Sequence, residues 1–285
     1  MAIGSALRRK LWQATRLAEK IDSAGKLPAD YQHTEAYRSG GFQGDVYAIG
    51  AGIENIDAGL VGMTDIGLVI AFRGTNGTFE DWMNNFLGEL TAYPGGGRVH
   101  TGFWRSVQNV HTYLFEKAQE LSAKYAPTAL YLTGHSKGGA MATLTGSELC
   151  RLMRDKLPKP EVITFAAPRV GDKDYANAYP CKHTRFESCR DIVPHLPLTP
   201  QEGELMHCVF ENFTGLFERY LTASMTQYAP LGTLEWIVPA GMGASYATSN
   251  AHGETLNALY YVMVELALKG RFSELGAYHT DDYIC

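Results

Sequence analysis

The chain has 285 residues, of which 45% are hydrophobic and 19% are charged, and its formal net charge is −5. This length and composition suit one large globular domain with a sizeable core, or at most two small domains. The negative charge and the lack of a Lys/Arg stripe argue against a nucleic-acid partner. No run of about 18 apolar residues occurs, so no transmembrane segment is predicted.

Two sequence features bear on the cellular compartment of the protein and on whether its cysteines are free thiols. The N-terminal residues lack the apolar stretch of a secretory signal, which predicts a cytoplasmic protein. The five cysteines are irregularly spaced and form no C-x-x-C motif, so free thiols and no metal site are expected. In an exported protein, Cys181 and Cys189 are the candidate pair for a disulfide.

The predicted elements alternate between helices and strands along the chain. A helix is predicted over residues 5–22, because apolar residues recur there every three or four positions. Its basic run Arg8-Arg9-Lys10 fits a surface helix packed on the domain or, alternatively, a contact with a lipid surface. Strands are predicted at 45–53, 67–72, 129–133, 161–165 and 184–187, and helices at 101–125 and 138–152.

This alternation predicts the α/β fold class, with a mostly parallel central sheet covered by helices on both faces. Residues 200–250 are less regular and rich in aromatic residues and glycine. We therefore expect a single domain over residues 1–285, with an N-terminal helix at 5–22 and a late insertion at 200–250.

The segment Gly134-His135-Ser136-Lys137-Gly138 lies between a predicted strand and a predicted helix. A sharp strand-to-helix turn forces the central serine into a strained conformation and exposes its hydroxyl at the carboxyl end of the sheet. The glycines lack a Cβ and leave room for this turn. The helix N-terminus favours negative charge nearby. Ser136 is therefore the candidate nucleophile; the alternative is a tight structural turn.

Three further sequence blocks accompany the serine turn in a fixed order. They are Ala71-Phe72-Arg73-Gly74-Thr75 with Asp81-Trp82 behind it, Val99-His100-Thr101-Gly102-Phe103, and residues 164–172 followed by Asp191-Ile192-Val193-Pro194. Together the four blocks resemble the class 3 lipase family of fungal and plant triacylglycerol lipases, which implies an α/β-hydrolase fold. The chain departs from the family at Lys137, where family members usually carry leucine, and in a long gap after Asp191.

A serine nucleophile needs a base within hydrogen-bond reach and a carboxylate that orients this base. In α/β-hydrolases the order along the chain is serine, acid, histidine. Asp191 follows a predicted strand and matches the acid in the family's Asp-Ile-Val-Pro block. The rival carboxylate, Asp172, is expected to shape a loop.

The base is expected to follow Asp191 in the sequence. His279 lies after a long apolar helix and resembles the histidine of the family's terminal His-x-x-x-Tyr pattern. His279 is therefore the favoured base, and His252 is the main alternative. The remaining histidines after the acid are His195 and His207.

An oxyanion hole needs donors aimed at the position where negative charge develops on the substrate carbonyl oxygen. One expected donor is the backbone N–H of Lys137, a role for which the side chain of this residue is not critical. The second is Thr75, which matches the family's position and offers both its N–H and its hydroxyl. Taken alone, the segment before Thr75 also fits a plain strand-to-loop turn.

A lid is the third expected feature of the site. Trp82, Met83 and Phe86 recur at helical spacing within residues 79–90, directly after the oxyanion segment. The matching segment of the family is a lid, and an apolar acyl pocket needs a cover in water. The alternative is that this apolar face packs on the sheet. The aromatic insertion at 201–250 is a second candidate for a cap or wall of the acyl site.

These features predict a carboxylic ester hydrolase that forms an acyl-enzyme on Ser136, and the resemblance implies acylglycerol substrates. The chemistry requires no cofactor and no metal. The expected partner is a lipid or a small-molecule ester, with transient contact at a lipid interface. The alternatives are a phospholipase A, a non-lipid esterase of the feruloyl type, and a catalytically silent binding module on the same fold.

Overall fold

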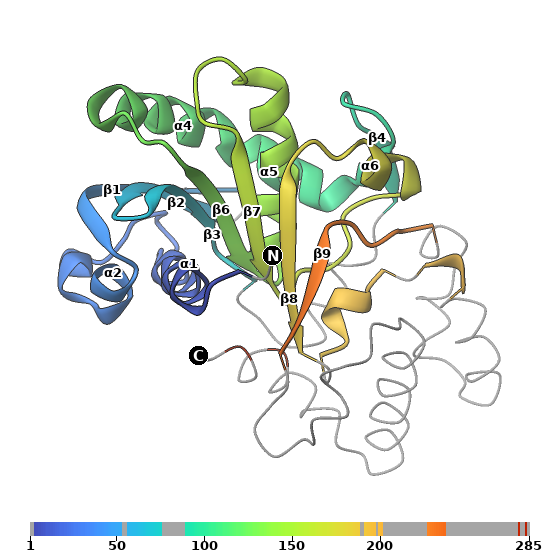
Figure 1. Cartoon of the computed structure of the whole chain (residues 1–285), viewed down its shortest axis with the longest axis horizontal. Helices are drawn as coiled ribbons and strands as arrows, with labels where there is room; N and C mark the ends of the chain where they lie inside the picture. Colours follow the sequence, from blue (N-terminus) through green and yellow to red (C-terminus); the bar gives the residue numbers. More distant parts are fainter. Residues whose placement is uncertain are drawn as a thin grey trace, which may run out of the picture.

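A seven-stranded sheet forms the centre of the computed structural model (Figure 1). The structure describes residues 3–52, 56–75, 89–188, 191–197, 199–201, 227–237, 279 and 283. The strands of this sheet are β1 (Phe42–Ala51), β2 (Asp57–Thr64), β3 (Gly67–Phe72), β6 (Leu130–His135), β7 (Pro160–Phe165), β8 (Lys182–Ser188) and β9 (Thr233–Ile237). Their order is β1-β2-β3-β6-β7-β8-β9, antiparallel from β1 to β3 and parallel from β3 to β9. The sheet is therefore mostly parallel, as predicted.

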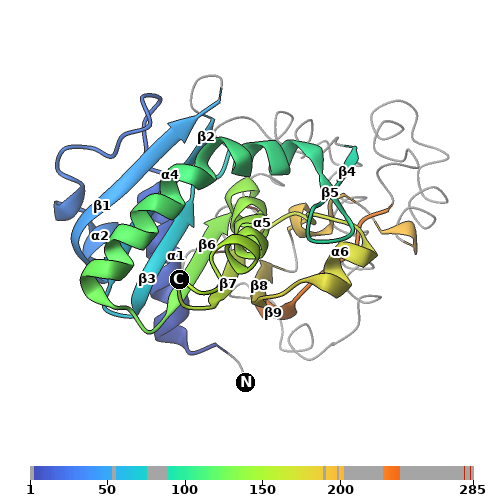
Figure 2. The same cartoon turned by 90° about the horizontal axis from the view of Figure 1, so that it is seen from above.

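Helices cover both faces of the sheet. The remaining elements are α1 (Ser5–Ala18), η1 (Tyr31–His33), α2 (Glu35–Ser39), α4 (Thr101–Tyr125), α5 (Lys137–Leu152), α6 (Lys173–Ala178), η3 (Val193–His195) and the hairpin of β4 (Leu90–Ala92) and β5 (Arg98–His100). Helices α4 and α5 lie on one face and α1 on the other (Figure 2). Because strand side chains alternate, Ile70 and Phe72 of β3 pack in the core on the α4 side, while Val69 and Ala71 pack in the core with α1.

The N-terminal helix is shorter than the predicted range of 5–22. It ends at Ala18, because the N–H groups of Lys20 and Ile21 bond the carbonyls three residues back, of Leu17 and Ala18. Such bonds tighten the last turn and take the chain off the α-helical path. Within the described ranges, every helix is too short or too polar to span a bilayer.

The carboxyl ends of the parallel strands bring three chain segments to one edge of the sheet. Strand β3 runs into Arg73–Thr75, β6 into Ser136, and β8 toward Asp191. Parallel neighbours end at the same edge, so these segments meet although they are far apart in sequence. This edge is where the candidate site lies.

Part of the expected insertion at 200–250 belongs to the central sheet. Residues 233–237 form β9, which pairs with β8 at the edge of the sheet. The rest of that range, apart from 200–201 and 227–232, lies outside the described residues, as do the lid candidates Trp82, Met83 and Phe86.

Candidate active site

The turn at Ser136 has the geometry of a nucleophile elbow. Ser136 joins β6 directly to α5 and has a φ of 56°, a value that non-glycine residues rarely adopt. A Cβ on Gly134 would lie 2.3 Å from the carbonyl carbon of Gly138, and a Cβ on Gly138 would lie 2.4 Å from the Phe72 carbonyl oxygen. Both glycines are therefore required for the close approach of β6, α5 and the end of β3.

The oxyanion candidates lie on either side of this turn. A Cβ on Gly74 would lie 3.2 Å from the carbonyl oxygen of His135, so the segment that carries Thr75 is packed against the elbow. Thr75 is half-buried and lines the same cavity as Ser136. Lys137 is the first residue of α5, where backbone N–H groups have no partner within the helix.

Asp191 and His279 are in direct contact. The Nδ1 atom of His279 lies 2.8 Å from Oδ2 of Asp191, and both side chains are fully buried. The Tyr283 hydroxyl donates to the same oxygen at 2.9 Å, and the Val193 N–H donates to Oδ1 at 2.9 Å. The carboxylate is thus fixed from three sides, and it orients the imidazole ring with Nδ1 toward it.

His135 links this pair to the elbow. The centroids of the His135 and His279 rings are 4.6 Å apart, and Nε2 of His135 lies 2.7 Å from the His279 carbonyl oxygen. Burial, followed by the nearby His279, lowers the pKa of His135 to about 3, so this ring is neutral near neutral pH. Because a carbonyl oxygen only accepts, the neutral ring carries its proton on Nε2. The residue before Ser136 therefore holds the backbone of His279 beside the elbow.

A buried ion pair lies behind the oxyanion position. The Nζ atom of Lys137 lies 2.5 Å from Oδ1 of Asp57, at the start of β2, and Asn109 donates to Oδ2 of Asp57 at 2.9 Å. Burial alone raises the pKa of Asp57, but the Lys137 ammonium and hydrogen bonds from Lys137, Ser106 and Asn109 outweigh it and hold the pKa below its usual value. The side chain that departs from the family pattern therefore has a charged partner.

The rival acid is used elsewhere in the fold. The Asp172 side chain caps α6 by accepting from the Tyr175 N–H at 3.0 Å, and it also accepts from the Arg98 side chain at 2.9 Å. Of the rival bases, His195 ends the short helix η3, and its carbonyl accepts from Arg169. His207 and His252 lie outside the described residues.

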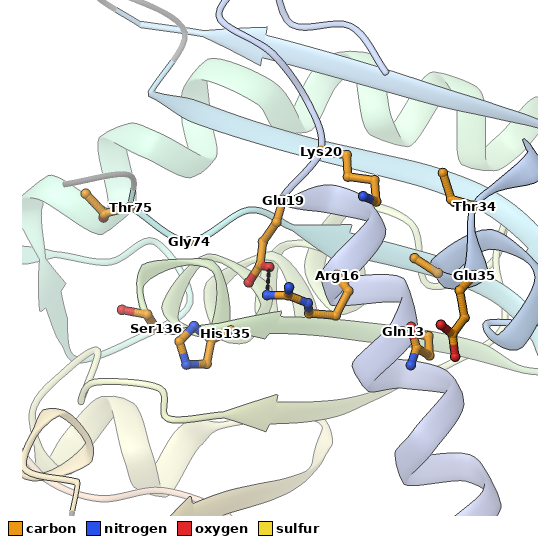
Figure 3. Close-up of a pocket in the computed structure, with 11 residues that line it drawn as sticks. Gln13, Arg16, Glu19, Lys20, Thr34, Glu35, Gly74, Thr75, His135 and Ser136 are labelled. Carbon is orange, nitrogen blue, oxygen red and sulfur yellow. Dashed lines mark hydrogen bonds and ion pairs between the residues drawn. The ribbon is translucent and has the colours of Figure 1, made fainter. Parts of the chain in front are cut away.

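A cavity of about 590 Å³ extends from Ser136 along α1 to α2 (Figure 3). Thr75 and Ser136 lie at one end, and Thr34 and Glu35 at the other. Arg16, which pairs with Glu19, and the exposed Lys20 line the wall between them. Charged groups of both signs therefore line this side of the site.

Three supporting residues were not found from the sequence: His135, Asp57 and Tyr283. His135 was part of the serine motif, and Tyr283 part of the terminal pattern, but neither motif states what its side chain contacts. Asp57 had no local signal, because its partner Lys137 is 80 positions away. Among the described residues, no group of three or more His, Cys, Asp and Glu side chains is placed to hold a metal ion.

Part of this chain is similar in sequence to known proteins. Residues 69–201 match the family model for class 3 lipases. A lipase of Rhizopus niveus is 32% identical over 146 residues, which cover 49% of this chain and 36% of the relative. A secreted mono- and diacylglycerol lipase of Penicillium cyclopium is 31% identical over 140 residues, 47% of this chain and 44% of the relative. The chain therefore aligns with less than half the length of these curated relatives.

The structural comparison reaches further along the chain. The solved structure of Rhizomucor miehei triacylglyceride lipase aligns with a TM-score of 0.60 at 21% identity, covering 83% of this chain and 82% of that chain. Likeness at this level of identity concerns the fold, and it confirms the predicted α/β-hydrolase fold.

Proposed function

We propose that this chain is a class 3 lipase, which hydrolyses acylglycerol-type carboxylic esters through an acyl-enzyme on Ser136; the match of residues 69–201 to that family's model supports this. The observation that supports the mechanism most directly is the buried contact of 2.8 Å between His279 Nδ1 and Asp191, held beside the strained serine by His135. Acyl transfer by a serine needs a base whose tautomer is fixed by a carboxylate, and the pair of His279 and Asp191 supplies such a base.

The proposed reaction has two acyl-transfer steps. Ser136 Oγ attacks the ester carbonyl carbon while His279 Nε2 takes its proton, and Asp191 stabilises the imidazolium that forms. The N–H groups of Lys137 and Thr75 donate to the oxyanion, aided by the N-terminus of α5. The imidazolium then gives its proton to the leaving alcohol. Water, activated by the same histidine, releases the acid and regenerates the serine.

Covalent labelling tests the nucleophile. We expect a fluorophosphonate to label the wild-type chain at Ser136, because the probe reacts with activated serines. Ser136→Ala should abolish labelling and lower kcat on a p-nitrophenyl ester by at least about 10³-fold. Labelling that persists in this variant would refute the proposal, and an unlabelled, inactive wild type would favour the silent binding module.

Phospholipase A activity is the second candidate, and the polar cavity favours it. Arg16 and Lys20 are cations beside the path from Ser136, and Glu35 is an anion at the far end. Such a wall suits the zwitterionic phosphate headgroup of a phospholipid better than the third acyl chain of a triacylglycerol. Burying charged side chains against an acyl chain is unfavourable. Activities on phosphatidylcholine, a triacylglycerol and a p-nitrophenyl ester separate phospholipase, lipase and simple esterase.

Lys20→Ala tests the headgroup wall in the same assays. If phosphate binds there, we expect this variant to lose roughly threefold to tenfold in kcat/KM on phosphatidylcholine, as for one exposed charge-assisted contact, and to keep its activity on the p-nitrophenyl ester. Lys26→Ala is the matched control, because Lys26 is an exposed lysine on the loop after α1. Equal losses on both substrates would contradict phosphate recognition.

Interface contact and compartment belong to the proposal as well. We propose that the chain meets its lipid substrate transiently at a lipid–water interface, through the segment of Trp82. A cytoplasmic location stays a prediction, which fractionation of cells that express the natural gene would test.

A further inference from the structure

Two cysteines outside the candidate active site lie close together. Cys150 is in the last turn of α5, and Cys181 directly precedes β8. Their sulfur atoms are 3.1 Å apart, and both thiols are free and half-buried. A disulfide bond is about 2.05 Å long, so a movement of about 1 Å joins the two sulfurs. The sequence had suggested Cys181 and Cys189 as the pair, whereas the described partner of Cys181 is Cys150.

The environment of Cys150 favours its thiolate. The hydrogen bond from the Cys181 thiol, with Lys159 and Arg154 nearby, lowers the pKa of Cys150 to about 7 against the opposing effect of burial. The same hydrogen bond and burial raise the pKa of Cys181. One thiol of the pair is thus a nucleophile near neutral pH, and the other keeps its proton until the second step.

A small cavity gives a reagent access to Cys150. Its volume is about 160 Å³, and its lining includes Cys150, Arg151, Arg154 and Pro180. Both arginines are exposed cations. Arg151 is in the last turn of α5 and pairs with Glu148, and Arg154 follows the end of that helix. Guanidinium groups bind carboxylates by charge-assisted hydrogen bonds, so an anionic reagent fits this site better than a neutral or cationic one.

We propose that Cys150 and Cys181 form a thiol–disulfide modification site, which a small anionic disulfide of the glutathione type oxidises to an internal disulfide. The Cys150 thiolate attacks one sulfur of the reagent, the reagent's S–S bond breaks, and one glutathione leaves as a thiolate. Cys181 then loses its proton and attacks the Cys150 sulfur of the mixed disulfide, which releases the second glutathione. The protein loses two electrons and two protons, and the reagent gains them.

The cross-link ties the end of the helix that follows Ser136 to the start of the strand that leads to Asp191. Closing the chain between positions 150 and 181 restricts the unfolded state, so the oxidised protein is more resistant to heat. For a domain of this size we expect a rise in Tm of roughly 5–10 °C on oxidation.

The test treats the reduced chain of 285 residues with glutathione disulfide. It uses no activity assay, so it is independent of the proposed hydrolase function. Intact mass, peptide mapping without reductant and thermal unfolding are measured for the wild type, Cys150→Ser, Cys181→Ser and the control Cys189→Ser. The wild type and Cys189→Ser should lose two hydrogens, give a linked peptide pair and gain in Tm. Cys181→Ser should instead retain one glutathionyl group on Cys150, and Cys150→Ser should show no gain in Tm.

Three outcomes would overturn the proposal. One is a linked peptide that joins Cys181 to Cys189, and another is an unmodified Cys150 in the Cys181→Ser variant. The third is a wild type whose oxidised and reduced forms have the same mass and the same Tm.

Discussion

The ion pair between Lys137 and Asp57 gives the residue after the nucleophile a second task beside its proposed oxyanion role. Its backbone N–H is the proposed oxyanion donor. Its side chain connects the elbow to β2, and Asn109 connects Asp57 to α4. The sequence showed that Lys137 departs from the family's leucine, and only the N–H was expected to matter. The fold adds that a buried carboxylate depends on this lysine.

Lys137→Leu separates the two tasks. We expect kcat per folded molecule to stay within about tenfold of the wild type, because the N–H remains. The free energy of unfolding should fall by about 2–4 kcal/mol, because Asp57 is left buried without its cation. Urea unfolding measures the free energy of unfolding. Kinetics normalised to the titrated concentration of active sites measure kcat. Asp57→Asn combined with Lys137→Leu should recover much of the stability, and an unaltered stability of Lys137→Leu would contradict this account.

The pH dependence of stability reports on the same pair. Since the pKa of Asp57 is lower in the folded chain than its ordinary value, its contribution is complete above the unfolded pKa of about 3.9 and is lost as the pH falls through the folded pKa. The wild-type advantage over Asp57→Asn should therefore be constant between roughly pH 5 and 7 and should shrink below about pH 4. An advantage that grows on acidification would assign the stabilisation to another group.

At the scale of elements, local patterns located the long helix and the buried strand well. Helix α4 and strand β3 span the predicted ranges 101–125 and 67–72. Strand β2 was not predicted, because its residues are almost all buried and two of them are glycines. A Cβ on Gly59 would lie 2.9 Å from the Phe72 ring, and one on Gly62 would lie 2.9 Å from the Phe42 ring. These glycines make room for aromatic rings from neighbouring strands, which no local pattern reveals.

The segment of Trp82 carries the prediction of a lid, and it lies outside the described residues. If its apolar face covers the acyl site in water, an interface stabilises the open form by burying that face. We expect activity on a short-chain ester to jump when the ester exceeds its solubility, and Trp82→Ala to reduce this jump without abolishing activity on the dissolved ester. A smooth saturation curve that the substitution leaves unchanged would contradict a lid and indicate a soluble esterase.

At the scale of the whole molecule, the site is assembled by long-range contacts. Asp191 and His279 meet across 88 positions of sequence. The order of serine, acid and histidine along the chain, together with the resemblance to the family's Asp-Ile-Val-Pro and His-x-x-x-Tyr patterns, pointed to both residues. The links that His135 and Tyr283 provide arise only from the packed fold. Helix α1 belongs to this assembly, because Trp12 packs against the rings of His135 and Tyr283 at centroid distances of 5.7 and 6.4 Å.

Trp12 therefore connects the core under α1 to the residues that hold His279 and Asp191. Trp12→Leu leaves space beside His135, which holds the His279 backbone, and beside Tyr283, which donates to Asp191. We expect a loss of about 2 kcal/mol in the free energy of unfolding and about a tenfold fall in kcat on a soluble ester. Urea unfolding followed by circular dichroism measures the loss of stability. Kinetics normalised to the titrated concentration of active sites measure the fall in kcat.

Trp104→Leu is the matched control on the opposite face of the sheet. Trp104 lies on α4, is half-buried, and contacts the Tyr93 ring at a centroid distance of 5.3 Å, in the core that excludes α1. This variant should lose stability through the same loss of apolar contact, yet keep kcat per folded molecule near the wild-type value. If both variants lost kcat equally, the cause would be a general loosening of the fold, and α1 would have no specific part in holding the histidine and the acid.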